Sequence, residues 1–202
     1  MKTRQIITIA LFGSAWGMLE ATLGGLLHLA FVPFTGTIMA SIGFAVLFAA
    51  FRSGVGPAGL ASVAALAASF KFLGVPLFGL APFDKTIVNP AVAIASQGLA
   101  FAAIFTTGRK PARFGAIAVR MLCAAALYMI AFNLVSVLAF GWPTNHTQAL
   151  FDAALLQLPL TAFCASLLSA ATGRIELPSS ARWQATAAVG CAAAAVAATY
   201  VI

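Results

Sequence analysis

The sequence is poor in charge. Only 7% of its 202 residues are charged, whereas 62% are hydrophobic and the mean hydropathy is +1.04. A soluble domain carries roughly 25% charged residues, so these side chains are too few to cover a water-facing surface. The composition therefore excludes an ordinary soluble domain. No long polar segment interrupts the chain, so we expect one transmembrane domain over residues 1–202.

Acidic residues are especially rare. Four Asp and Glu residues stand against eleven Lys and Arg residues, which gives a formal net charge of +7. In a soluble protein this balance would suggest nucleic acid, but here the basic residues form short clusters between apolar runs. Such clusters are typical of the loops that set membrane topology. We therefore predict contact with the lipid bilayer and no nucleic-acid partner.

The sequence also lacks the motifs of metal sites and catalysis. Its three cysteines, Cys123, Cys164 and Cys191, lie inside apolar runs at spacings that match no metal signature. It contains no Gly-x-Ser-x-Gly or His-Glu-x-x-His run, and no Gly-x-x-x-x-Gly-Lys-Ser/Thr loop for ATP. We predict a protein that is not an enzyme, holds no cofactor or metal, and cannot drive ATP-dependent transport alone.

Long apolar runs dominate the chain instead. About 20 apolar residues in a helix span the hydrocarbon core of a bilayer. The runs predict an all-α, polytopic membrane helix bundle with a six-helix core and a seventh, alanine-rich C-terminal helix. The predicted spans are about 6–31, 36–51, 56–72, 88–107, 115–140, 149–171 and 183–202.

Basic residues fall in alternate connections between these spans. One orientation places all of these connections in the cytoplasm, as the positive-inside rule requires. We therefore predict a multi-pass protein of the cell's inner (plasma) membrane with a cytoplasmic N-terminus. The residues concerned are Lys2, Arg4, Arg52, Arg109, Lys110, Arg113, Arg174 and Arg182.

Polar side chains concentrate toward the opposite, outer side. Glu20 lies about 21 Å along the first helix from Ile6, near mid-membrane or slightly beyond. A carboxylate there must be paired, hydrated or protonated. It is either a ligand contact or proton site, or a structural tie to Lys71 or His28. We predict a ligand-binding set of Glu20, His28, Lys71, Asp84, Gln97, Asn133 and Gln157.

Small residues recur every fourth position of the first helix, at Gly13, Gly17, Ala21 and Gly25. Such a ridge lets another helix backbone approach closely, either within this chain or in a partner subunit. Two outer connections, 32–36 and 75–89, are apolar enough to cover a bound ligand and exclude water from it.

With these features the chain resembles the substrate-binding S components of energy-coupling factor (ECF) transporters. In that family the first helix docks on a shared transmembrane subunit through an alanine-x-x-x-alanine-type motif. The nearest matches here are Ala10-xxx-Ser14 and Gly13-xxx-Gly17. The resemblance implies capture of a vitamin or micronutrient from the outer face. It also implies a transmembrane coupling subunit and ATPase subunits as partners.

Two other functions are open at this stage. The chain could be a non-transport assembly subunit of a larger membrane complex, which the small-residue ridge and the short helices would suit. It could also be a metal-ion transporter using Glu20, His28, Asp84 and His146.

Overall fold

The computed structural model describes residues 3–73, 81–107, 113–141, 152–172 and 180–201. These ranges hold seven α-helices and no β-strand, so the predicted all-α class is confirmed. The α-helices are α1 (Thr3–Leu29), α2 (Thr35–Arg52), α3 (Pro57–Ser69), α5 (Lys85–Phe105), α6 (Phe114–Phe140), α8 (Leu158–Thr172) and α9 (Ala181–Val201). A 3-10 turn η1 (Phe70–Leu73) follows α3, and a π-helical turn η2 (Ala153–Gln157) precedes α8.

Five helical segments are long and apolar enough to cross a membrane. They are α1, α2, α5, α6 and the segment Ala153–Ala171 that joins η2 to α8. The segment Pro57–Leu73, made of α3 and η1, is apolar but shorter. The chain is therefore a membrane protein built from apolar helices. A six-helix core with an added seventh helix stays a prediction.

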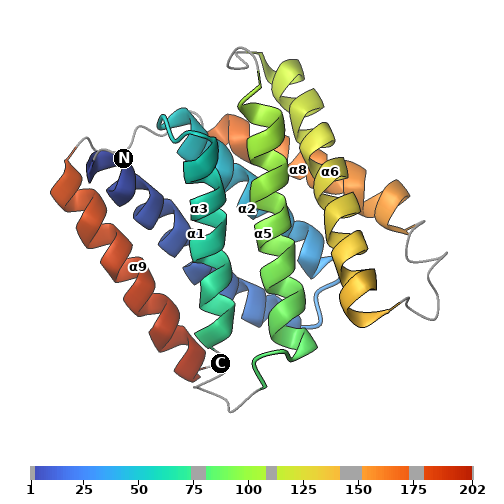
Figure 1. Cartoon of the computed structure of the whole chain (residues 1–202), viewed down its shortest axis with the longest axis horizontal. Helices are drawn as coiled ribbons and strands as arrows, with labels where there is room; N and C mark the ends of the chain where they lie inside the picture. Colours follow the sequence, from blue (N-terminus) through green and yellow to red (C-terminus); the bar gives the residue numbers. More distant parts are fainter. Residues whose placement is uncertain (1–2, 74–80, 108–112, 142–151, 173–179, 202) are drawn as a thin grey trace.

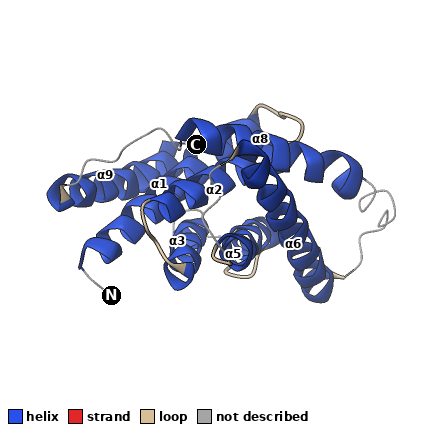
Figure 2. Cartoon of the chain, turned by 90° about the horizontal axis from the view of Figure 1, so that it is seen from above, coloured by secondary structure: helices blue, strands red, loops and turns tan. Residues whose placement is uncertain are grey.

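The helices form two layers, which Figure 2 shows from above. One layer contains α9, α1, α2 and α8, and the other contains α3, α5 and α6. Contacts between neighbours within each layer, and between α1 and α3, α2 and α5, and α6 and α8 across the layers, hold the bundle together. Helices α1 and α9 start at the same end of the bundle and run side by side (Figure 1). A hydrogen bond from the Thr8 hydroxyl to Gln184 Oε1 (3.4 Å) joins the two helices near their N-terminal ends.

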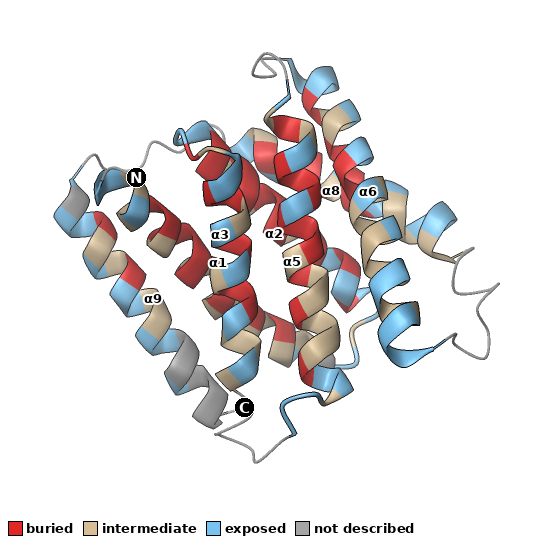
Figure 3. Ribbon diagram, in the orientation of Figure 1, coloured by how far each residue is buried: buried red, intermediate tan, exposed pale blue. Residues whose placement is uncertain are grey.

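The core lies between α1, α2, α3 and α5, where buried residues gather in Figure 3. Phenylalanines of α2 and α5 fill much of it, including a stacked pair, Phe101 and Phe105, with ring centroids 4.1 Å apart. In contrast, few residues of α6 are buried, whereas most residues of α2 are buried. Since α6 is the more apolar of the two, its exposed face is the one suited to lipid.

Helix α5 begins three residues before the predicted start at 88, because Asp84 caps it. The Asp84 carboxylate accepts bonds from the Thr86 hydroxyl (2.6 Å) and the Thr86 backbone N–H (2.8 Å). These bonds hold the pKa of the Asp84 carboxyl below its ordinary value, and the bond from the Thr86 hydroxyl has the larger effect. With this N-cap, Lys85, Thr86 and Ile87 form the start of the helix.

The small-residue ridge of α1 packs inside this chain at two of its positions. A Cβ atom on Gly13 would lie 2.8 Å from the Leu66 side chain of α3, and one on Gly17 would lie 2.6 Å from the Phe70 ring of η1. Both glycines are buried, and α1 lies along α3. The absence of side chains here sets how closely α1 approaches α3 and η1.

Replacement of Gly17 by Leu should destabilise the protein by about 1–3 kcal/mol, because the new side chain must displace Phe70. Thermal unfolding in detergent micelles measures the change. Gly115→Leu is the matched control, since a Cβ on the exposed Gly115 of α6 meets nothing within 4 Å. Equal melting temperatures for the two variants would contradict the packing.

Candidate functional site

Two charged side chains meet inside the bundle. The Lys71 Nζ atom lies 3.0 Å from Glu20 Oε2 and also donates to the Glu20 backbone carbonyl oxygen at 3.2 Å. The Glu20 side chain is 10% exposed and the Lys71 side chain 20%. The pairing predicted between these two residues is therefore present. It satisfies a carboxylate that would otherwise be costly among apolar helices.

The glycines of α1 position this ion pair. Gly17 lies against Phe70, the residue directly before Lys71 in η1. Because η1 can approach α1 this closely, the Lys71 ammonium reaches both the side chain and the backbone of Glu20. A larger residue at position 17 would move η1 away and lengthen the ion pair.

A second polar group lies one helical turn deeper, where α1, α2 and α5 meet. The Trp16 side chain is fully buried, and its Nε1 atom has no hydrogen-bond partner among the described residues. The Gln97 carboxamide of α5 is also buried and donates to the Ala40 carbonyl oxygen of α2. A Cβ on Gly43 would lie 2.8 Å from both Trp16 Cε2 and Gln97 Nε2, so both groups press against this glycine.

The ion pair and this deeper group follow one seam between α1 and α2. A Cβ on Gly24 would lie 3.7 Å from Glu20 Oε2 and 3.8 Å from Met39 Cε, so the carboxylate lies beside Met39. Met39 and Gly43 are one turn apart on α2, as Glu20 and Trp16 are on α1. We call Trp16, Glu20, Lys71 and Gln97 the interior polar cluster.

The other predicted ligand-binding residues lie outside this cluster or outside the described side chains. Asp84 caps α5, and Asn133 Nδ2 donates to the Met129 carbonyl oxygen of its own helix at 2.7 Å. Gln157 ends the π-helical turn η2 and is half-buried. The His28 side chain is outside the described part of the structure. Their role as ligand contacts stays a prediction.

A polar contact that the sequence analysis did not predict joins the start of α5 to the end of α6. The Ser136 hydroxyl donates to Asn89 Oδ1 at 3.1 Å, which ties the two helices together. Lys85 Nζ lies 5.7 Å from the centre of the Phe140 ring, a cation–π contact between the same helices. Ser136 and Asn89 are polar residues inside apolar runs, and this feature of the sequence could have indicated the first contact.

Of the two predicted covering segments, 32–36 is described in full and 75–89 only from residue 81. Phe83, from the segment 75–89, is 88% exposed, and Phe34, from 32–36, is 49% exposed. Phe34 adopts a left-handed conformation (φ 59°) directly before α2. Residues 75–80, including Leu77, Phe78 and Leu80, lie outside the described residues. The proposed covering of a ligand stays a prediction.

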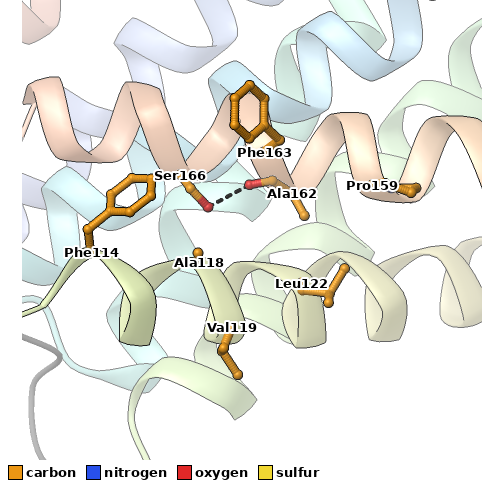
Figure 4. Close-up of a pocket in the computed structure, with 8 residues that line it drawn as sticks. All are labelled: Phe114, Ala118, Val119, Leu122, Pro159, Ala162, Phe163 and Ser166. Carbon is orange, nitrogen blue, oxygen red and sulfur yellow. Dashed lines mark hydrogen bonds between the residues drawn. The ribbon is translucent and has the colours of Figure 1, made fainter.

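An apolar groove of about 300 Å³ lies elsewhere, between α6 and α8 (Figure 4). Its walls include Phe114, Leu122 and Phe163, with Ser166 as a polar member. The Ser166 hydroxyl already donates to the Ala162 carbonyl oxygen at 2.6 Å. The groove therefore offers its occupant little beyond apolar contact, and a polar solute is better served by the interior polar cluster.

Metal coordination has no support in the part of the chain that the structure describes. No three His, Cys, Asp or Glu side chains gather there. Of the residues considered for a metal-ion transporter, Glu20 is paired with Lys71 and Asp84 caps α5. His146 lies outside the described ranges.

These features define a membrane protein whose described residues are helical, with an ion pair between buried Glu20 and half-buried Lys71 and, one turn away, an indole N–H without a partner among the described residues. Searches against protein-family models, curated proteins and solved structures found no match to this chain.

We expect Lys71→Met to destabilise the protein by about 3–5 kcal/mol, because it leaves the buried Glu20 carboxylate unpaired. Adding Glu20→Gln should restore part of this loss, since the double variant holds no unpaired charge. Thermal unfolding of the two single variants and the double variant measures the coupling. Arg52→Met is the control, because Arg52 is exposed at the end of α2. Strictly additive losses would show that the ion pair contributes nothing.

Proposed function

We propose that this protein is the membrane-embedded solute-binding subunit of an uptake system, similar to the S component of an ECF transporter. It captures a small molecule of the vitamin or micronutrient class from the outer face of the plasma membrane, with its N-terminus in the cytoplasm. A transmembrane coupling subunit and ATPase subunits supply the energy. The observation that carries this proposal is the Glu20–Lys71 ion pair, which is held among apolar helices.

The placement of the pair supports solute binding. Glu20 lies in the second half of α1, and Lys71 follows the end of α3, so both lie beyond the middle of their helices as counted from the N-terminal end of α1 and α3. Basic residues lie at the other end, including Arg52 at the end of α2 and Arg113 before α6. This distribution is the one the positive-inside rule gives for a cytoplasmic N-terminus. It supports a position of the interior polar cluster on the side from which a solute would arrive.

The burial of charge also favours this function over an assembly subunit. Apolar packing alone can hold helices together, and replacing a buried ion pair by apolar residues is often neutral or stabilising. Intramembrane ionisable residues commonly mark the path of a substrate or ion. An assembly subunit would need only the glycine contacts at Gly13 and Gly17, which already join α1 to α3 and η1.

Mass spectrometry of small molecules released from the purified, denatured protein tests the proposal. We expect one compound in near-stoichiometric amount from the wild-type protein. In Glu20→Gln, affinity for that compound should fall roughly ten- to a hundredfold, because a charge-assisted hydrogen bond is lost. Arg52→Gln, a charge removal at an exposed site at the end of α2, should retain the compound. Release of no specific compound, or equal affinity in Glu20→Gln, would contradict the proposal.

A further inference from the structure

The fully buried indole of Trp16 carries a hydrogen-bond donor that no described residue satisfies. Its Nε1–H is a donor and cannot accept, and it has no partner among the described residues. Burying such a donor without an acceptor costs about 1–3 kcal/mol. A tryptophan that served only to fill space could be a phenylalanine without this cost. The N–H group therefore points to an acceptor that is bound from outside the chain.

The surroundings of Trp16 hold further polar groups. The ring edge that carries Nε1 lies against Gly43, on which the Gln97 carboxamide also presses. The Gln97 amide group donates one N–H to the Ala40 carbonyl oxygen, so its acceptor Oε1 and its second N–H are the groups it can offer a solute. One turn farther out, the Lys71 side chain is 20% exposed and is the member of the cluster most open to water.

The charge of the cluster determines which solutes it suits. Glu20 and Lys71 cancel one another, and Trp16 and Gln97 are neutral. An ionic solute would add an uncompensated charge among apolar helices, which is costly. An uncharged solute adds none.

We propose that the interior polar cluster binds an uncharged polar molecule, whose carbonyl oxygen or ring nitrogen accepts the hydrogen bond from Trp16 Nε1. The inference rests on the proposed function and narrows it to a substrate class and a contact residue. Gln97 Oε1 accepts from a donor on the same molecule. The Glu20–Lys71 pair closes the outer side of the site.

Nuclear magnetic resonance of protein labelled with ¹⁵N in its tryptophan indoles tests this site directly. The chain has three tryptophans, Trp16, Trp142 and Trp183. Trp142→Phe and Trp183→Phe assign two signals, so the Trp16 signal follows without altering the site. The probe is a small-molecule filtrate of yeast extract, split by anion- and cation-exchange resins into a neutral flow-through and two charged fractions.

The neutral flow-through should move the Trp16 indole proton signal downfield, as a new hydrogen bond does, and leave the other two signals in place. The same fraction should have no such effect on Lys71→Met, whose site has lost charge balance. A shift produced only by a charged fraction would overturn the substrate class. The melting temperature with the whole filtrate, measured in parallel, separates the two proposals. A raised melting temperature with an unmoved Trp16 signal overturns this site alone, and no change in either overturns the proposed function as well.

Discussion

A bilayer offers no hydrogen-bond partner, and the polar residues of this protein are arranged around that constraint. Backbone groups are satisfied within the helices, so the remaining cost falls on polar side chains. Most of these bond to a carbonyl oxygen of their own helix, as Thr22 does to Met18 and Ser41 does to Thr37. Glu20 cannot be satisfied in this way, because a carboxylate has no donor when ionised. It requires a cation from another element, and Lys71 provides it.

The ion pair in turn depends on close helix packing. Without side chains, Gly13 and Gly17 admit Leu66 and Phe70, and η1 then carries Lys71 to the carboxylate. Gly43 has the same role deeper in the bundle, where Trp16 and Gln97 converge. Helix α9 is also rich in small residues, chiefly alanine. Its small side chains allow it to pack closely along α1. Apolar packing thus fixes the geometry of the few polar contacts.

Much of this architecture could be predicted from the sequence. Hydropathy located the helices to within a few residues, because a span must be both long and apolar. Glu20 stood out because acidic residues are rare in this sequence. Lys71 was its expected partner because few basic residues lie inside the apolar runs. The start of α5 was missed because an Asp84 cap extends a helix into a polar stretch that hydropathy assigns to a loop.

The role of Trp16 could not be predicted in the same way. A tryptophan in an apolar run looks like core, and only the tertiary packing shows that its N–H group lacks a partner within the described ranges. The meeting of Trp16 with Gln97 likewise joins residues from α1 and α5 that are far apart in sequence. Side chains of Asp84 and Asn133 looked equally available to a ligand, but local hydrogen bonds engage both. The polar residues of the sequence are candidates for a site, and the tertiary packing determines which of them lie close together.

The central claim is that the seam between α1 and α2 holds a solute beside a buried ion pair. An experimental structure of the protein in lipid nanodiscs, prepared with its co-purified small molecule, tests this claim most directly. We expect Glu20 to face the bundle interior, within hydrogen-bonding distance of Lys71 or the solute, with solute density next to Trp16 Nε1. A Glu20 side chain that faces lipid, or a closely packed seam with the small molecule bound elsewhere, would contradict it.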